Sequence, residues 1–462
     1  MPKKAVAIFF IAAFLGAVLF VYLTFPRTKD EIPQSNNQRP FLPAAPEPGG
    51  VPVPEPGPAP NTPKLPSGPK LHVMTWASPE EAQTLHARAD AFTAASGREV
   101  ALTIDSTPEA YRKDLQAAII TSSPPDVCLI SSRDFCGLDP TRQLAQVTPL
   151  PGSAPRSLAA FTVDTRIKAI PTEYSVDVLY YNPVYFDQAG LGYPGPHWNW
   201  DILESIARAL TSLKLKDAAG EPAYPLELSP SFDLWNVLCA QDGHPALDLN
   251  HWHIADDGTK DIQLRALFLI HHLFQELSVT APVTPATETP GHYFALQRVA
   301  IFIGSSDLTA SLPNFPYRYT ILPSDITRAS QAQVNGWAVT ARAPDSDAAQ
   351  ALATYLASRP LHNGWSSVLK PSPNDASANL CYQALSQALI PRIDAKSAPL
   401  AQFVDQQILL LSQNFNSKTD DTYDNIQQEF QSETSAPAIE TGLPKASSSS
   451  PPSTSSAPSG GI

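Results

Sequence analysis

The sequence predicts an α/β fold, and three observations carry that prediction. Between residues 71 and 131, short runs of apolar and β-branched residues alternate with helical stretches. A longer run, AIPTEYSVDVLYYN at residues 169–182, has the β-branched and aromatic composition of a buried strand. The two ends of the chain are rich in proline and serine, a composition that does not form a packed core. The fold is therefore expected between those ends.

The first 70 residues are predicted to be an anchor and a linker. Residues 5–25 form one uncharged apolar run after Lys3 and Lys4, and its length suits a bilayer span of ~20 residues. We interpret residues 1–30 as an uncleaved signal anchor, with a cleaved signal peptide as the alternative. Residues 31–70 are a proline-rich linker of extended structure, and residues 432–462 are a disordered Ser/Pro-rich tail. The body is then exported and tethered to the membrane.

The first strands and helices follow one another with clear boundaries. Residues 71–78 read as a strand, and Ser78-Pro79-Glu80-Glu81 has the pattern of a capping box that starts a helix. That helix carries Leu85, Ala89 and Phe92 on one face and ends near Gly97. Further strands are expected at 99–104 and 127–130, with a helix at 111–120 between them. This alternation predicts a parallel sheet with right-handed crossovers.

Polar and aromatic side chains follow the carboxyl ends of these strands. In open parallel sheets, ligands bind outside those ends. The residues that fall there are Trp76, Ser78, Ser106, Ser131 and Asp134.

The run at 169–182 carries a polar cluster, Glu173, Tyr174 and Ser175, ahead of its apolar part. Polar groups near one end of a buried strand are how a two-lobed protein presents ligand contacts where the chain crosses between lobes. An ordinary core strand preceded by a turn is the alternative.

Composition and motifs exclude several functions. The net charge of −13 argues against a nucleic-acid partner. There is no nucleophile elbow, no phosphate-binding glycine loop and no metal-ligand spacing, so neither an enzyme nor a cofactor is predicted. The four cysteines, Cys128, Cys136, Cys239 and Cys381, match no zinc pattern. Either disulfides or buried thiols are compatible with their positions.

Several segments together resemble the extracellular solute-binding proteins of ABC importers, in the group that binds sugars and related polyols. The strand ending Thr75-Trp76, the helix opening at Ser78 and Pro125-Asp126-Val127 resemble that family's first lobe. The later segments that resemble it are the crossing segment 169–182, NPVYFDQAGL (182–191), HWNWDILESIARAL (197–210), FALQRVAIFIGSSDL (294–308) and VNGWAV (334–339). The chain departs from the family at Gln297, where a glycine is usual, and it lacks the usual lipidation cysteine.

The resemblance implies a two-lobed periplasmic-binding-protein fold (type II) with an interlobe ligand cleft and a hinge. The solute-binding domain would cover residues 71–431, with lobe 1 at about 71–175 and 298–330 and lobe 2 at about 180–295 and 335–431. It further implies a receptor outside the cytoplasm that captures a carbohydrate or polyol and delivers it to ABC transporter permease subunits. A two-lobed scaffold or sensor component with a different ligand, or none, is the alternative.

A sugar site needs flat apolar faces for stacking and polar side chains for hydroxyl groups. The candidates for stacking are Trp76, Tyr174, Trp235, Trp337 and Trp365. The candidates for hydroxyl contacts are Asp134, Glu173, Ser305 and Asp307, with Ser78, Ser106 and Ser131 beside them. Core packing is the alternative for each tryptophan. Tyr180 and Tyr181 also raise the hypothesis of ferric iron, which binds phenolate oxygens, and glycerol phosphate derivatives are a further alternative ligand.

Overall fold

The structure is a computed structural model that describes residues 62–217, 219–248, 253–254, 259–284, 287, 289–391 and 397–435. The predicted anchor at 1–30 and most of the linker at 31–70 lie outside these residues. So does the predicted tail beyond Ser435, the last residue of helix α14 (Thr419–Ser435). Among the described residues no helix is long and apolar enough to cross a membrane.

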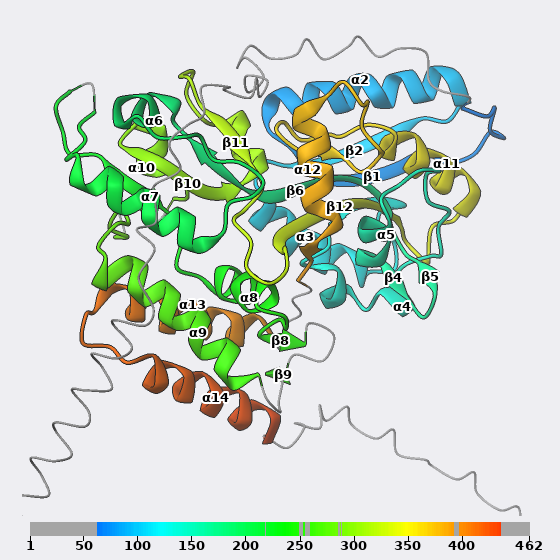
Figure 1. The fold of residues 1–462 in the computed structure, drawn as a ribbon. Coiled ribbons are helices and arrows are strands. Elements are labelled where there is room, and N and C mark those ends of the chain that lie inside the picture. The colour runs from blue at the N-terminus through cyan, green and yellow to red at the C-terminus, as the bar shows by residue number, and fades with distance from the viewer. Residues whose placement is uncertain are drawn as a thin grey trace, which may run out of the picture.

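One large sheet runs through the molecule (Figure 1). Its strands follow the order β2-β1-β3-β12-β6-β10-β7, with β11 and β13 also paired to β6 and β14 to β12. The strands of the main path are β1 (Leu71–Trp76), β2 (Val100–Asp105), β3 (Val127–Ser131), β6 (Ile170–Tyr181), β7 (Tyr224–Glu227), β10 (Val299–Ser305) and β12 (Ser330–Val339).

The predicted elements at the start of the fold are confirmed. β1 pairs in parallel with both β2 and β3. Helix α2 (Pro79–Ser96) begins with the capping box of Ser78 and Glu81 and buries Leu85 and Phe92 against the sheet. It ends at Gly97, whose φ of 83° is the left-handed conformation that glycine adopts without steric cost. Helix α3 (Pro108–Ile119) follows β2, as the alternation of strands and helices predicts.

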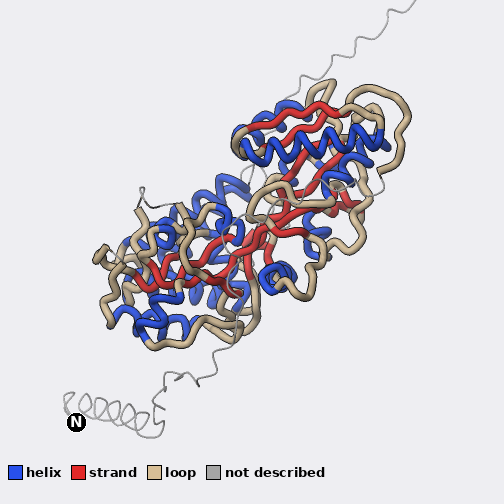
Figure 2. Tube along the Cα trace, turned by 90° about the horizontal axis from the view of Figure 1, so that it is seen from above, coloured by secondary structure: helices blue, strands red, loops and turns tan. Residues whose placement is uncertain are grey.

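Strand β6 joins the two lobes. Residues 170–176 pair with β12, and from Asp177 onward the strand pairs with β10. Figure 2 shows strands continuing through the narrow waist between two larger masses of helix and sheet. The two-lobed α/β fold is therefore confirmed, and β6 is the strand that changes neighbours between the lobes.

Each lobe has helices of its own. Lobe 1 is built on β2, β1 and β3 with α2, α3 and α11 (Ser346–Ala357). Lobe 2 is built on β10 and β7, and its core cluster draws on α7 (Trp200–Ser212), α8 (Phe232–Gln241), α9 (Lys260–His271), α13 (Ser397–Gln413) and α14. Figure 1 shows these two sets of helices at opposite ends of the sheet.

The contacts differ from the expected lobe boundaries in two places. Helix α11, expected in lobe 2, packs Leu352 and Leu356 into the same core cluster as Leu71 of β1. Strand β10, expected in lobe 1, pairs with β7 of lobe 2. Both segments lie next to crossing strands, so their order in the chain does not reveal on which side of the crossing they pack.

The remaining elements are short or peripheral. They are η1 (Phe135–Leu138), α4 (Pro140–Gln143), α5 (Pro155–Ala160), β4 (Thr162–Val163), β5 (Arg166–Ile167), α6 (Pro183–Ala189), β8 (Leu247–Asp248), β9 (His253–Ile254), η2 (His272–Glu276), α10 (His292–Ala295), η3 (Ser306–Ala310), β11 (Arg318–Thr320), β13 (Ser366–Ser367), α12 (Ala376–Ser386) and β14 (Ala388–Leu389). Gln297, in the turn before β10, has a φ of 57°, which gives a physical reason for the glycine usual at that position in the family it resembles.

Candidate functional site

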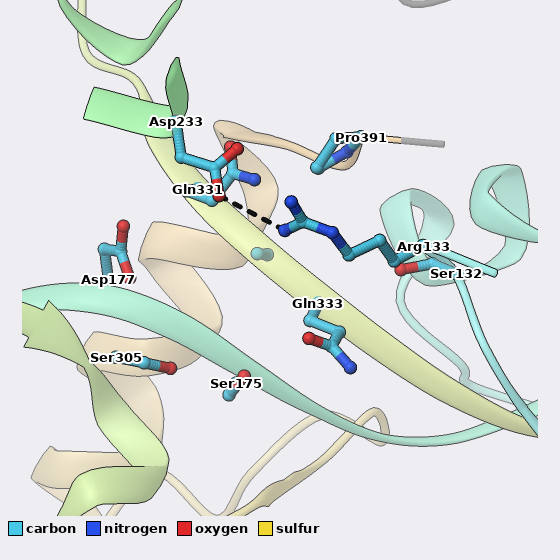
Figure 3. A pocket seen from close by; sticks show the side chains of 10 residues that line it. Ser132, Arg133, Ser175, Asp177, Asp233, Ser305, Gln331, Gln333 and Pro391 are labelled. Atoms are coloured by element: carbon cyan, nitrogen blue, oxygen red, sulfur yellow. Dashed lines mark hydrogen bonds and ion pairs between the residues drawn. The ribbon is translucent and has the colours of Figure 1, made fainter. Parts of the chain in front are cut away.

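Two adjoining cavities lie where β6 changes its neighbours. The smaller has a volume of about 160 Å³ and is polar (Figure 3). Its walls come from the turn after β3, from β6, β10 and β12, and from the first turn of α8. The side chains that characterise it are Arg133, Ser175, Asp177, Asp233, Ser305, Gln331 and Gln333.

The larger cavity has a volume of about 300 Å³, at the lower end of the ~300–1,000 Å³ range of ligand pockets. It shares Asp177, Asp233 and Ser305 with the smaller one. Its other lining residues include Asp307 and an apolar group, Leu228, Leu234, Val237, Ile303 and Leu322. Together the cavities offer carboxylates and hydroxyls at the junction and an apolar wall on one side.

Asp177 lies at the centre of this junction. It is opposite Ser305 in the β6–β10 ladder, at the first position where β6 pairs with β10. No described residue donates a hydrogen bond to its carboxyl group. Burial, with added repulsion from Asp233 and Asp307, raises the pKa of Asp177 to about 8. This raised pKa favours the protonated form of the carboxyl group at neutral pH.

An ion pair spans the smaller cavity. Arg133, from the turn after β3, places Nη1 3.3 Å from Oδ2 of Asp233, in the first turn of α8. Figure 3 shows the guanidinium reaching toward Asp233, with Ser175, Asp177 and Ser305 on one side of the pair. Both side chains are about one-third exposed, so the pair is worth little to stability. Because its partners come from different lobes, it links the lobes across the cavity.

Of the residues that the sequence suggested as ligand contacts, Ser305 and Asp307 line the cavities. Ser305 lines both, and Asp307 lines the larger one. The structure brings these two together with Asp177, which the sequence reasoning did not select.

Glu173 lies apart from the cavities, in a closed hydrogen-bond network. Its side chain is fully buried and accepts bonds from Asn335 Nδ2 at 3.0 Å, from the backbone N–H of Leu361 at 2.6 Å and from that of His362 at 3.1 Å. His362 Nδ1 also donates to it. Burial alone would raise the pKa of Glu173, but the His362 charge and these hydrogen bonds lower it below its usual value. With its oxygens occupied, Glu173 organises lobe 1 rather than the cavities.

The aromatic candidates do not wall the cavities. Trp76 is partly buried and stacks on His362, with ring centroids 3.7 Å apart. Tyr174, Trp235 and Trp337 are core residues with 0–1% exposure, and Trp235 Nε1 donates to Gln263 O at 3.1 Å. Among the described residues that line the two cavities there is no tryptophan, tyrosine or phenylalanine. The expected stacking of a ligand on these rings has no counterpart in this geometry.

The serine and aspartate candidates at the strand ends have local roles. Ser78 caps α2, and Ser106 is exposed in the turn after β2. Ser131 Oγ donates to Asp134 Oδ2 at 2.8 Å, and Asp134 forms an ion pair with Arg112 at 2.9 Å. These residues lie outside the two cavities.

The tyrosine pair does not support the iron hypothesis. Tyr180 and Tyr181 are buried, and Tyr180 OH donates to Ser305 O at 2.9 Å. Burial raises the pKa of both phenols, which disfavours the phenolate that ferric iron would bind. Cys128, Cys239 and Cys381 are buried free thiols.

The sequence contains a pattern that points to Asp177, Gln331 and Gln333, which were not among the candidates. Glu173, Ser175 and Asp177 alternate along β6, and one further two-residue step from the polar cluster reaches Asp177, the only charged residue in the apolar part of that strand. Gln331 and Gln333 alternate in the same way on β12. Asp233 had no such signal, because an acidic residue in the first turn of a helix is common.

The family comparison agrees with this geometry. The profile of the bacterial extracellular solute-binding proteins matches residues 76–360, more than half of the chain. The comparison with curated proteins found no match.

Solved structures share the fold at low sequence identity. The cyclic α-maltosyl-1,6-maltose binding protein from Arthrobacter globiformis is 16% identical, with a TM-score of 0.64, covering 79% of this chain and 99% of its own. An ABC substrate-binding protein from Listeria monocytogenes in complex with cycloalternan is 15% identical, with a TM-score of 0.63, and covers 80% and 99%. The GacH receptor of Streptomyces glaucescens, solved unliganded and with acarbose, is also 15% identical, with a TM-score of 0.63, and covers 79% and 99%. By its matched profile and its two-lobed fold, the chain belongs to the bacterial extracellular solute-binding proteins.

Proposed function

We propose that the protein is an extracytoplasmic receptor that captures a carbohydrate or related polyol between its lobes and delivers it to an ABC importer. The observation that carries this proposal is the polar junction of the two cavities at the point where β6 changes neighbours. Side chains from β6, β10, β12 and α8 meet there. A ligand held by both lobes stabilises one relative position of the lobes, which a permease could then recognise.

The chemistry of the lining residues supports a hydroxyl-rich ligand. Ser175, Ser305 and Gln333 offer donors and acceptors, while Asp177 and Asp307 offer carboxyl groups that suit paired hydroxyls. Solved structures of the same fold hold cycloalternan, acarbose, maltose and maltotriose. The apolar wall of the larger cavity gives a sugar ring a face to pack against.

A scaffold or sensor role is the second candidate, and two observations favour it. The Arg133–Asp233 ion pair spans the smaller cavity, and neither cavity has an aromatic wall among the described residues. In that case the lobes are linked by the protein's own side chains, and no sugar binds.

A thermal-shift screen separates the two candidates. The folded protein is incubated with monosaccharides, disaccharides, polyols and glycerol phosphodiesters. A ligand at 100 times its Kd stabilises the native state by about 2.7 kcal/mol, which raises Tm by several degrees. A sugar that raises Tm and binds in calorimetry supports the receptor, whereas no shift with any of these compounds supports the scaffold.

The membrane tether is a separate part of the proposal. The apolar run at residues 5–25 is long for a cleaved signal peptide, so we expect it to stay attached and to hold the receptor outside the cytoplasm. N-terminal sequencing of mature protein from membranes tests this. A mature chain that starts after residue 25 would contradict the tether and leave the receptor unchanged.

A further inference from the structure

The junction of the two cavities is rich in acceptors. Asp177, Asp233 and Asp307 line the cavity space, and the first two line both cavities. Asp233 Oδ1 and Asp307 Oδ1 are buried atoms without a hydrogen-bond partner in the described part of the chain. A buried acceptor without a donor costs free energy, and a ligand that donates removes that cost.

Two neutral side chains in the wall of the smaller cavity also lack hydrogen-bond partners among the described residues. Gln331 is only 8% exposed and lines the smaller cavity, and its Oε1 has no partner among the described residues. Ser175 is 4% exposed, lines the same cavity and has no described hydrogen bond through its hydroxyl group. Both side chains are buried, line the cavity and have no described partner at these atoms, as expected of groups that bind a ligand.

The charge balance favours a cationic ligand. Arg133 is the one cationic side chain among the described lining residues, and it is already paired with Asp233. Asp307 and Asp177 therefore have no described cationic partner, and Asp177 avoids an unpaired charge by holding a proton. Among the described residues, no lysine or histidine lines either cavity. A sugar hydroxyl both donates and accepts, whereas a protonated amine donates three hydrogen bonds and accepts none. The amine is therefore the better complement to this set of acceptors.

The cation is organic rather than a metal ion. In the described residues, no three Asp, Glu, His or Cys side chains are grouped so that they could hold one metal ion. The carboxyl groups instead border cavities of about 160 and 300 Å³, which have room for a molecule.

We propose that the solute is an amino sugar whose protonated amine binds among Asp177, Asp233 and Asp307. Its hydroxyl groups then bind Ser175 and Gln331, and its ring packs on the apolar wall of the larger cavity. This inference rests on the proposed function, because it names the class of carbohydrate that the same site takes.

Binding of such a ligand is coupled to a proton. The charged groups that face Asp177 are Asp233 on α8 and Asp307 on η3, with Arg133 paired to Asp233, while β12 contributes the neutral Gln331 and Gln333. Asp177 is protonated at pH 7, since its pKa is about 8. An ammonium group beside it lowers that pKa and releases the proton, whereas a neutral sugar releases none.

Three disaccharides of matched size provide the test. They are cellobiose, diacetylchitobiose and the deacetylated glucosamine dimer. At the position where they differ, cellobiose carries a hydroxyl group, diacetylchitobiose an acetamide group and the glucosamine dimer an ammonium group. Calorimetric titration at pH 7 is run in two buffers of different ionisation enthalpy. We expect the glucosamine dimer to bind at least tenfold more tightly than the other two, and only its heat to depend on the buffer.

Two variants locate the effect. Asp177→Asn keeps the shape of the protonated carboxyl group, so it should fold, lose the tenfold preference and abolish the buffer dependence. Asp90→Asn, on the exposed face of α2, is the matched control and should change neither quantity. Equal or tighter binding of the neutral sugars would overturn the amino-sugar inference and leave the receptor standing. If none of the three disaccharides binds, and no saccharide in the thermal-shift screen binds either, both the amino-sugar inference and the proposed receptor function are overturned.

Discussion

Two carboxyl groups four residues apart on β6 have opposite surroundings. Glu173 lies on the lobe 1 side and accepts hydrogen bonds from Asn335, Leu361 and His362. Asp177 lies at the crossing, borders both cavities and accepts none from a described residue. In spite of burial, the pKa of Glu173 is lowered by His362 and its hydrogen bonds, whereas burial raises the pKa of Asp177 to about 8. One strand thus carries a structural anion and an acid that faces a cavity, and the number of donors supplied by the rest of the fold makes the difference.

The largest expected effect comes from removing the partner of Glu173. His362→Ala leaves a buried charge without its counter-ion, which costs on the order of 3–5 kcal/mol. It also removes the ring that stacks on Trp76. Urea denaturation measures the loss in the free energy of unfolding.

His86→Ala, on the exposed surface of α2, is the matched control and should change that free energy by less than about 0.5 kcal/mol. A loss of less than about 1 kcal/mol for His362→Ala would mean that Glu173 does not depend on this pair.

The next effect concerns Asp177 and pH. A folded-state pKa raised to about 8 means that the folded protein holds a proton which the unfolded chain releases near pH 4, so stability falls as pH rises between these values. Asp177→Asn removes this dependence. As the pH rises from 5 to 8, the free energy of unfolding of the variant should increase relative to that of the parent by at least about 1.4 kcal/mol, the value of one pKa unit.

Denaturation curves at several pH values check this second prediction. Glu173→Gln should show no such gain, because the carboxyl group it replaces is stabilised in its ionised form. A parent and an Asp177→Asn variant whose stabilities run parallel across this range would contradict the raised pKa.

The smallest expected change in stability belongs to the ion pair across the cavity. Arg133→Gln should alter the free energy of unfolding by only about 0–1 kcal/mol, because both partners are partly exposed. It should nevertheless let the lobes separate, since the pair links β3 to α8 through the cavity. Small-angle scattering of the ligand-free variant should show a larger radius of gyration than that of the parent.

The matched control for this variant is Arg208→Gln, which breaks the Glu204–Arg208 pair within helix α7. That variant should scatter like the parent. If Arg133→Gln also scatters like the parent, the ion pair does not hold the lobes together.

The sequence predicted local elements well and long-range contacts poorly. The capping box at Ser78, the end of α2 at Gly97 and the crossing strand are set by residues close to one another in the chain. Glu173 was expected to face a ligand because it belongs to a polar cluster near one end of a buried strand. Its partner His362 lies 189 residues away, and no local pattern predicts that pair. Trp235 was a candidate for stacking on a ligand, yet its indole N–H donates to Gln263 O in the core. Ser305, in the segment that resembles the family's return to lobe 1, lines both cavities, and its contact with a ligand stays a prediction. The strand that carries it, β10, pairs within lobe 2.

The ionisation of Asp177 tests the account most directly. The protein is labelled with ¹³C at the aspartate carboxyl carbons, and NMR spectra are recorded from pH 4 to pH 10, with Asp177→Asn to assign the signal. We expect one carboxyl carbon that titrates near pH 8 and is missing in the variant. The same carbon should titrate at lower pH when the glucosamine dimer is bound. Aspartate side chains in folded proteins ordinarily titrate below about pH 6. If no aspartate carboxyl carbon titrates above that value, Asp177 is an ordinary ionised side chain and the contrast with Glu173 disappears.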